Sequence, residues 1–306
     1  MNPVLAAQES RARELIDPAV LTWIDDGAVE GTWSSYAFRP HVLRDVSSVS
    51  TGTSLFGTTL RAPVLVGPTA FHDRLHPLAE KATAEGAAAA GSLMVWSMRA
   101  SVPFEGTGWW QAYVLQDKAL TLDACLRARD AGASAVVLTG DTPYLGTARR
   151  APLGDLDQAP AVLADIDWLA TRTGLPVLVK GVLRADDAEA CLDAGAAGIV
   201  VSNHGGRQLG RTVTTAQALP EVVAAVANRV PVLVDGGIRT GLDVLCALAL
   251  GASAVLLGKP VLWGLAADGA DGVEACLRAL SDDLAFVMGL AGCTSLTDID
   301  RSLVAG

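Results

Sequence analysis

The chain has 306 residues, of which 51% are hydrophobic and 18% charged, and its formal net charge at pH 7 is −10. This acidic balance repels nucleic acid and anionic membrane surfaces, so we expect neither as a partner. We expect no membrane-spanning segment, since no apolar run approaches the roughly 18 residues needed, and no secretory signal. The length suits one large α/β barrel or two ordinary domains.

Five cysteines are scattered along the sequence without a CxxC pair. An odd number of cysteines with no pairing pattern is typical of a reducing compartment, where free cysteines serve as small core side chains. We therefore expect a cytoplasmic protein without a disulfide framework.

The first 60 residues differ in pattern from the rest of the chain. A helical pattern runs from Glu9 to Ile24, and Asp17-Pro18 offers a cap and a first-turn proline for a second helix. A mixed stretch follows from Arg39 and ends at the turn Leu55-Phe56-Gly57. We expect residues 1–60 to form a helical lid or plug against a catalytic domain of residues 61–306.

From Ala62 onward, short β-branched runs alternate with alanine-rich amphipathic stretches. Unbroken apolar runs indicate parallel strands covered by helices, and eight such units in about 230 residues predict a (β/α)8 TIM barrel. A doubly wound open sheet is disfavoured because no GxGxxG follows the first strand. The expected strands are Val64–Gly67, Leu93–Ser97, Trp110–Val114, Ala135–Thr139, Val177–Lys180, Ile199–Ser202, Val232–Asp235 and Ala254–Leu257. The expected helices are Leu75–Ala90, Ala119–Ala131, Ala161–Thr173, Ala185–Ala194, Ala216–Ala227, Gly241–Leu250 and Val261 to about Gly289, and only the connection Ala100–Gly108 is too short for one.

Polar side chains follow nearly every expected strand. In a TIM barrel, functional groups gather at the carboxyl ends of the strands, and random loop polarity would not place so many ionisable groups there. These residues are Thr69, Ser97, Gln111, Tyr113, Thr139, Asp141, Lys180, Ser202, His204, Arg207, Asp235, Arg239 and Lys259.

The stretch Gly198–Gly210 carries the most suggestive pair. A buried-strand pattern stops at Ser202-Asn203, and a glycine-rich turn then presents His204 and Arg207. An imidazole can act as a base, and a guanidinium can hold a carboxylate or phosphate, so the pair suggests chemistry on a small acid. Taken alone, the stretch is equally compatible with a polar loop.

The last two strand ends predict a phosphate site. Asp235-Gly236-Gly237 and Gly258-Lys259-Pro260 each open a helix, where backbone N–H groups and the helix dipole favour an anion, and Arg239 and Lys259 add positive charge. Lys180 faces the same barrel mouth. It would stabilise a reduced flavin in one class of enzyme, or form a Schiff base in an aldolase-type enzyme.

Seven motifs in order resemble those of the FMN-dependent 2-hydroxy-acid oxidase/dehydrogenase family. The most specific is Ser202-Asn203-His204-Gly205-Gly206-Arg207-Gln208. The other six are Pro68-Thr69-Ala70, Gln111-Ala112-Tyr113, Asp141-Thr142-Pro143, Val179-Lys180-Gly181, Asp235-Gly236-Gly237-Ile238-Arg239 and Gly258-Lys259-Pro260. The resemblance implies FMN at the barrel mouth, oxidation of a 2-hydroxy acid to a 2-oxo acid, reoxidation by O2 or another carrier, and a homo-oligomer such as a tetramer.

The resemblance also assigns roles to residues. His204 would be the base, oriented by Asp141, and Arg207 with Tyr113 would hold the substrate carboxylate. The residues expected to bind substrate are Trp23, Arg99, Tyr113, Arg149, His204 and Arg207. The residues expected to bind FMN are Pro68, Thr69, Ala70, Ser97, Gln111, Thr139, Lys180, Ser202, Asp235, Gly236, Gly237, Arg239, Gly258 and Lys259.

Three departures from the family pattern bear on the substrate. Trp23 stands where relatives have a tyrosine that touches the carboxylate. Ala148 aligns with a substrate-binding arginine, unless Arg149 or Arg150 replaces it, and the long loop after the fourth strand is mostly missing. A more open site with fewer anchors favours a bulky, aromatic or carrier-linked acid of the mandelate type over glycolate or lactate, and Arg99 offers a replacement cation.

Other functions remain open at this stage. The chain is also compatible with a family relative that has moved to different flavin chemistry, with a phosphate-binding lyase or isomerase that uses Lys180, and with a non-catalytic relative. We expect no metal site. His72 and His76 have helix-like i,i+4 spacing but lack a third ligand, so we interpret both as structural.

Overall fold

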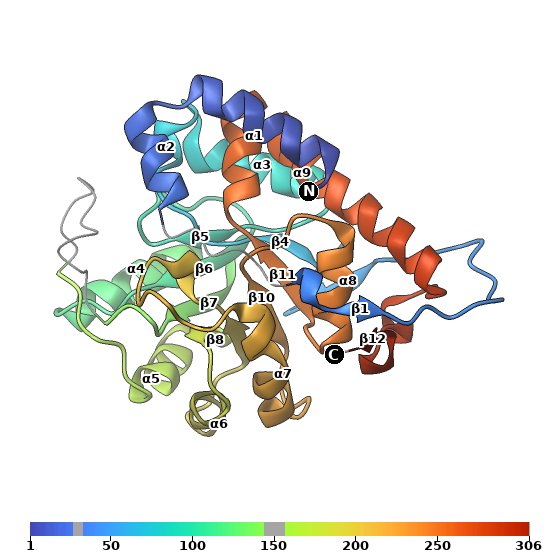
Figure 1. The fold of residues 1–306 in the computed structure, drawn as a ribbon. Coiled ribbons are helices and arrows are strands. Elements are labelled where there is room, and N and C mark those ends of the chain that lie inside the picture. The colour runs from blue at the N-terminus through green and yellow to red at the C-terminus, as the bar shows by residue number, and fades with distance from the viewer. Residues whose placement is uncertain (27–32, 144–156, 306) are drawn as a thin grey trace.

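Eight parallel strands form the central sheet of the computed structural model, which describes residues 1–26, 33–143 and 157–305 (Figure 1). The strands are β4 (Val64–Val66), β5 (Val95–Ser97), β6 (Gly108–Ala112), β7 (Ala133–Thr139), β8 (Val177–Val182), β9 (Gly198–Val201), β10 (Val232–Asp235) and β11 (Ala254–Leu257). They pair in the order β4-β11-β10-β9-β8-β7-β6-β5, and a parallel bridge between Val66 and Met94 closes the sheet on itself. The predicted TIM barrel is therefore confirmed.

The barrel strands are buried on both faces, which is why their sequences read as unbroken apolar runs. One set of side chains, including Leu65, Trp109, Leu178 and Leu233, meets inside the barrel. The alternate set packs outward against the helices in a second, larger cluster. All eight predicted strands are present, although β6 begins at Gly108, two residues before the predicted start.

Helices cover the outside of the barrel. They are α3 (Ala79–Ala89), α4 (Lys118–Asp130), α5 (Ala164–Thr173), α6 (Ala185–Asp193), α7 (Thr215–Val226), α8 (Gly241–Ala249) and α9 (Lys259–Ala291). Residues 98–107, all of them described, contain no helix, as the short connection predicted. The long helix α9 is kinked at Asp268-Gly269, where the backbone leaves the helical region.

Two helices precede the barrel, α1 (Pro3–Leu15) and α2 (Pro18–Asp25). The second begins where Asp17-Pro18 predicted it, with the Asp17 carboxylate accepting a hydrogen bond from the Ala19 N–H. The first begins six residues before the predicted Glu9, because Asn2 caps it in the same way and Pro3 fills its first turn. Figure 1 shows α1 lying along α9, and the Gln8 amide donates to the Gly272 carbonyl there.

A hairpin of β2 (Thr53–Leu55) and β3 (Thr58–Leu60) lies at the amino-terminal end of the barrel. Leu55 and Leu60 join the cluster inside the barrel, and Phe56 at the turn packs edge-on against Trp109, with ring centroids 5.4 Å apart. A second small pairing joins β1 (Ala37–Phe38) to β12 (Val304–Ala305). Among the described residues of the first 60, this hairpin therefore covers the amino-terminal end of the barrel.

Short 3-10 helices complete the described fold, at Trp33–Ser35, His72–Arg74, His204–Gly206, Leu296–Asp298 and Arg301–Leu303. No helix within residues 1–26, 33–143 or 157–305 is long and apolar enough to cross a membrane.

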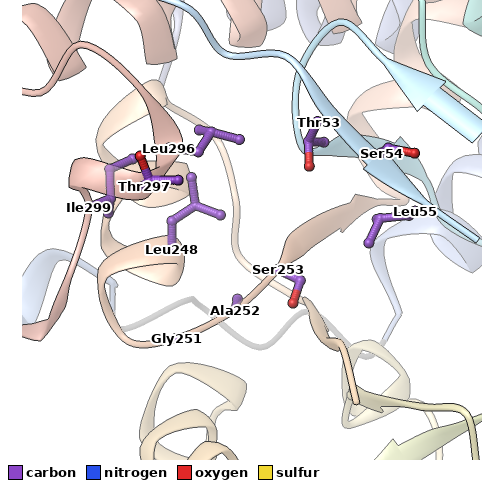
Figure 2. Close-up of a pocket in the computed structure, with 10 residues that line it drawn as sticks. All are labelled: Thr53, Ser54, Leu55, Leu248, Gly251, Ala252, Ser253, Leu296, Thr297 and Ile299. Carbon is purple, nitrogen blue, oxygen red and sulfur yellow. The ribbon is translucent and has the colours of Figure 1, made fainter. Parts of the chain in front are cut away.

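A hollow of about 420 Å³ lies beside β2, the turn before β11 and the 3-10 helix at Leu296 (Figure 2). It is at the amino-terminal end of the strands, away from the predicted functional end. The ten residues that line it are apolar or carry only hydroxyl groups, such as Thr53, Ser253 and Thr297. This hollow therefore offers no acid, base or charged anchor for chemistry.

Candidate active site

His204 and Asp141 meet at the carboxyl ends of β9 and β7. Nδ1 of His204 lies 3.1 Å from Oδ1 of Asp141, and both side chains are more than four-fifths buried. The His204 backbone adopts a left-handed conformation, φ 55°, and its N–H donates to Oγ of Ser202. The strand end thus aims the imidazole at the carboxylate.

The Asp141 carboxylate is ionised in this setting. Burial acts to raise its pKa, but the hydrogen bond and charge of His204, together with Lys180, hold the pKa below its ordinary value of 3.8. A carboxylate can only accept, so Nδ1 of His204 donates to it. Nε2 is then the basic nitrogen, which is the arrangement of an oriented general base.

Gly181 makes room for this pair. Its φ is 108°, and a Cβ placed on it would lie 2.5 Å from both Cβ and Cγ of Asp141. The strand β8 is irregular at this point, between Lys180 and Val182. A glycine here lets the strand pass directly behind the Asp141 carboxylate.

A buried polar triangle lies at the ends of β8, β9 and β10. Lys180 Nζ donates to Ser202 Oγ at 2.8 Å and lies 3.1 Å from Asp235 Oδ2, while Ser202 Oγ donates to the same oxygen at 2.8 Å. Burial acts to lower the pKa of Lys180, but the charges of Asp235 and Asp141 outweigh it and raise the pKa. Lys180 is therefore a fixed ammonium beneath the barrel mouth.

A second polar group crosses β6 and β7. The Gln111 amide donates to Thr139 Oγ1 at 2.9 Å and to the Tyr113 hydroxyl at 3.2 Å. Its Oε1 is buried and has no hydrogen-bond partner among the described residues, and the same holds for Oδ2 of Asp141 and Oδ1 of Asp235. Buried polar atoms are normally satisfied, so these orphaned atoms indicate a site built for a polar ligand.

Cations and glycines gather at the ends of β10 and β11. Gly236 and Gly237 have φ values of 95° and 75°, and Gly258 begins α9 without a side-chain cap on the helix N–H groups. Burial lowers the pKa of Lys259, and the nearby charges of Arg207 and Arg239 lower it further. These three cations repel one another and lie near the uncapped N-terminus of α9. Together they form a site for an anion.

These observations fit FMN. The orphaned polar atoms of Gln111 and Asp235, next to the Lys180 ammonium, match the polar edge of a flavin ring. The glycine turns with Arg239 and Lys259 match its phosphate. Ser97, whose Oγ accepts the Arg99 N–H, and the loop Pro68-Thr69-Ala70 border the same end of the barrel.

Arg207 lies against the N-terminal helix α2. Its Nη2 donates to the carbonyls of Trp23 and Ile24 at 2.6 and 3.1 Å, and its guanidinium stands over the Trp23 ring at 4.8 Å from the centroid. The sequence predicted both Arg207 and Trp23 at the site but not their contact. Through it, α2 is tied to the loop that carries His204.

Arg99 stands over the other predicted substrate residue, Tyr113, with its guanidinium carbon 5.4 Å from the ring centroid. Nε and Nη2 of Arg99 are buried and have no hydrogen-bond partner in the part of the chain that the structure describes. Burial raises the pKa of Tyr113, so its hydroxyl stays protonated. Arg149, Ala148 and most of the predicted short loop after β7 lie outside the described residues.

Two local contributors to the site were not predicted from the sequence, namely the steric role of Gly181 and the contact between His72 and Thr69. Nε2 of His72 lies 2.7 Å from Oγ1 of Thr69, and the imidazole is fully buried. The signal available in the sequence was the three-residue spacing of Thr69 and His72 shortly after the end of a predicted strand. In the described part of the chain, no group of three or more His, Cys, Asp or Glu side chains is placed to hold a metal ion.

The chain is similar to known proteins over nearly its whole length. The family model for FMN-dependent dehydrogenases matches residues 26–160 and 153–306. A peroxisomal (S)-2-hydroxyacid oxidase of Arabidopsis thaliana is 41% identical, over 87% of this chain and 84% of that protein. Glycolate oxidase of Spinacia oleracea is 38% identical, over 97% and 94%. The crystal structure of mandelate oxidase with (S)-2-phenylpropionate superposes with a TM-score of 0.92 at 38% identity, over 98% and 97%.

Proposed function

Because the chain belongs to the family of FMN-dependent 2-hydroxy-acid oxidases and dehydrogenases, we propose that it oxidises a bulky, aromatic (S)-2-hydroxy acid of the mandelate type to the 2-oxo acid. It is an FMN-dependent enzyme that acts on 2-hydroxy acids. The observation that carries this proposal is the contact between His204 and Asp141 beside the buried Lys180 ammonium.

Two groups of residues would hold the cofactor. Gly236, Gly237, Arg239, Gly258 and Lys259 would bind the phosphate. The ring would lie against the strand ends, and its neighbours would be Pro68, Thr69, Ala70, Ser97, Gln111, Thr139, Lys180, Ser202 and Asp235. When bound, FMN supplies the acceptor for two electrons.

His204 would act as the base. Its Nε2 takes a proton from the substrate, while the Asp141 carboxylate stabilises the imidazolium that results. Arg207 and the protonated Tyr113 would hold the substrate carboxylate and fix the α-carbon in reach of Nε2. The substrate loses two electrons and two hydrogens in total, one as the proton on His204, and becomes a 2-oxo acid.

The surroundings of Arg207 support a bulky substrate. The Trp23 ring, which stacks on the guanidinium, has a single N–H donor and no acidic hydroxyl, so it gives less help to a carboxylate than a tyrosine would. Arg99 stands above Tyr113 with two buried nitrogens that no described residue partners, and it would supply the second cation. Mandelate oxidase superposes on nearly the whole chain, which agrees with an aromatic substrate.

The structure bears differently on two alternative functions that the sequence left open. A lyase or isomerase that forms a Schiff base on Lys180 requires a neutral amine, whereas Asp235 and Asp141 hold Lys180 as an ammonium. A family member with a different flavin reaction would keep the same FMN site. It would differ in failing to be reduced by any 2-hydroxy acid.

We also propose O2 as the electron acceptor, since the similar proteins are oxidases by name.

The five cysteines are buried and unpaired, which agrees with a reducing compartment such as the cytoplasm, although one similar plant protein is named as peroxisomal.

Anaerobic reduction of the purified holoenzyme tests the substrate assignment. Bleaching of the flavin absorbance by (S)-mandelate, lactate and glycolate is followed by stopped-flow, and the rate constant divided by the half-saturating concentration is compared. We expect (S)-mandelate to give the highest value. A higher value with glycolate or lactate would contradict the bulky-substrate assignment, and no bleaching by any of them would favour different flavin chemistry.

A further inference from the structure

His72 links the barrel mouth to the outer helix α3. Its Nε2 lies 2.7 Å from Oγ1 of Thr69, in the loop after β4, and its Nδ1 lies 2.9 Å from Oγ1 of Thr83 in α3. His72 and Thr83 are both 0% exposed. The backbone N–H of His72 donates to the buried carboxylate of Glu80, which anchors the 3-10 turn that carries the ring.

The imidazole of His72 is neutral. Burial lowers its pKa to about 3, and the charge of Asp73 offsets this only in part. A neutral imidazole has one ring proton and one lone pair, and each ring nitrogen faces a hydroxyl. The two hydrogen bonds must therefore run in the same sense, either from Thr69 toward Thr83 or from Thr83 toward Thr69.

The burial of Thr83 determines in which direction the two hydrogen bonds of His72 run. Within the described residues, Thr83 Oγ1 has no hydrogen-bond partner other than His72. If Nδ1 carried the proton, the Thr83 hydroxyl would accept, and its own proton would be buried without an acceptor, which is unfavourable. If Thr83 donates to Nδ1, every buried proton is used, and Nε2–H donates to Thr69.

We propose that Thr83, His72 and Thr69 form a one-way hydrogen-bond chain that makes the Thr69 hydroxyl a donor toward FMN, with His72 as a positioning residue. This rests on the proposed function, because the placement of Thr69 against FMN is part of it. The Thr69 methyl group already lies beside Gly258, 3.6 Å from the position of a Cβ there. With Oγ1 accepting from His72, the Thr69 proton is left for the barrel mouth.

This chain has a consequence for the cofactor. A hydrogen-bond donor beside a flavin ring stabilises the electron-rich reduced form more than the oxidised form, because the interaction strengthens as negative charge builds up. The chain therefore raises the midpoint potential of bound FMN. Thr83, which does not touch the cofactor, acts on it through His72.

The tautomer of His72 is the first test. The chain contains four histidines, so nitrogen NMR of protein labelled at the imidazole ring gives few signals, and a His72→Gln variant assigns this one. We expect Nε2 to carry the proton and Nδ1 to be bare, with no titration down to about pH 5. A proton on Nδ1 would overturn the proposal.

The midpoint potential is the second test, and matched variants at Thr83 make it specific. Thr83→Val keeps the side-chain shape but removes the donor, while Thr83→Ser keeps the hydroxyl. We expect Thr83→Val to shift the FMN potential to a more negative value and Thr83→Ser to leave it at the wild-type value. Thermal unfolding of both variants checks that the fold is retained.

A double-mutant cycle distinguishes coupling through the hydrogen-bond chain from a general effect of altered packing. Thr69→Val should shift the potential in the same direction as Thr83→Val, and adding Thr83→Val to it should produce no further shift. Full additivity, or a Thr83→Val potential equal to the wild-type value, would overturn the proposal. If the wild-type protein binds no FMN, the proposed function is contradicted as well. If it binds FMN but Nδ1 of His72 is protonated, only the hydrogen-bond chain is contradicted.

Discussion

His204 donates from Nδ1 to Oδ1 of Asp141 across 3.1 Å, although the two residues are 63 positions apart in the chain. They follow β9 and β7, and β8 runs between these two strands in the sheet. The contact therefore spans a strand, and it requires a residue without a side chain where β8 passes Asp141. Gly181 meets this requirement.

Gly181→Ala should lower activity by displacing Asp141. The added methyl group would lie 2.5 Å from the Asp141 side chain, so the carboxylate must move and the imidazole loses its orientation. We expect kcat to fall by about 10²-fold or more, within the range for a misplaced general base. FMN binding, measured by absorbance and fluorescence titration, should change much less.

Gly195→Ala is the matched control for this variant. Gly195 has a similar left-handed φ of 90°, but a Cβ there meets nothing within 4 Å. It therefore carries the same kind of backbone strain without touching the site, and kcat should remain near the wild-type value. Equal losses of kcat in both variants would mean that strain, and not the position of Asp141, causes the effect.

Lys180 gives a pH dependence to stability. Its folded-state pKa lies above the ordinary value of 10.5, so the pairing with Asp235 contributes fully below that pH and is lost as pH rises through the folded-state pKa. We expect the difference in free energy of unfolding between wild type and Lys180→Met to shrink steadily above about pH 10.5. Urea unfolding from pH 7 to 11 measures it, and a difference that grows with pH would contradict the assignment.

Trp23→Tyr should improve the use of small substrates. A tyrosine hydroxyl beside Arg207 adds a carboxylate donor, and one such hydrogen bond is worth about tenfold in binding. We expect KM for glycolate to fall by about that factor, with kcat little changed. Trp23→Phe, which alters the ring but adds no hydroxyl, is the control, and an equal decrease there would show that ring size is responsible.

The sequence predicted the parts of this protein that follow from local pattern. Apolar runs located all eight strands, and the rule that strand ends converge brought His204, Asp141 and Lys180 to one end of the barrel. The hydrogen bond of Arg207 to the Trp23 carbonyl could not be predicted, because it depends on how α2 docks against the barrel. The contact of His72 with Thr83 could not be predicted for the same reason, since it requires the packing of α3 on the loop after β4.

The role of Gly181 illustrates a different limit. In the sequence it is one of 31 glycines, and its neighbours Val179 and Lys180 suggest only the end of a strand. Its importance comes from a steric contact with Asp141, which follows the adjacent strand β7. Such a contact depends on strand register, which periodicity leaves undetermined.

The reductive half-reaction of His204→Ala tests the central claim most directly. The variant should bind FMN and show the flavin absorbance of the wild type, because His204 is assigned to proton transfer and not to holding the cofactor. On anaerobic mixing with (S)-mandelate, we expect the rate of bleaching to fall by about 10²- to 10⁴-fold. Bleaching at the wild-type rate would remove His204 from the mechanism and contradict the account of the site.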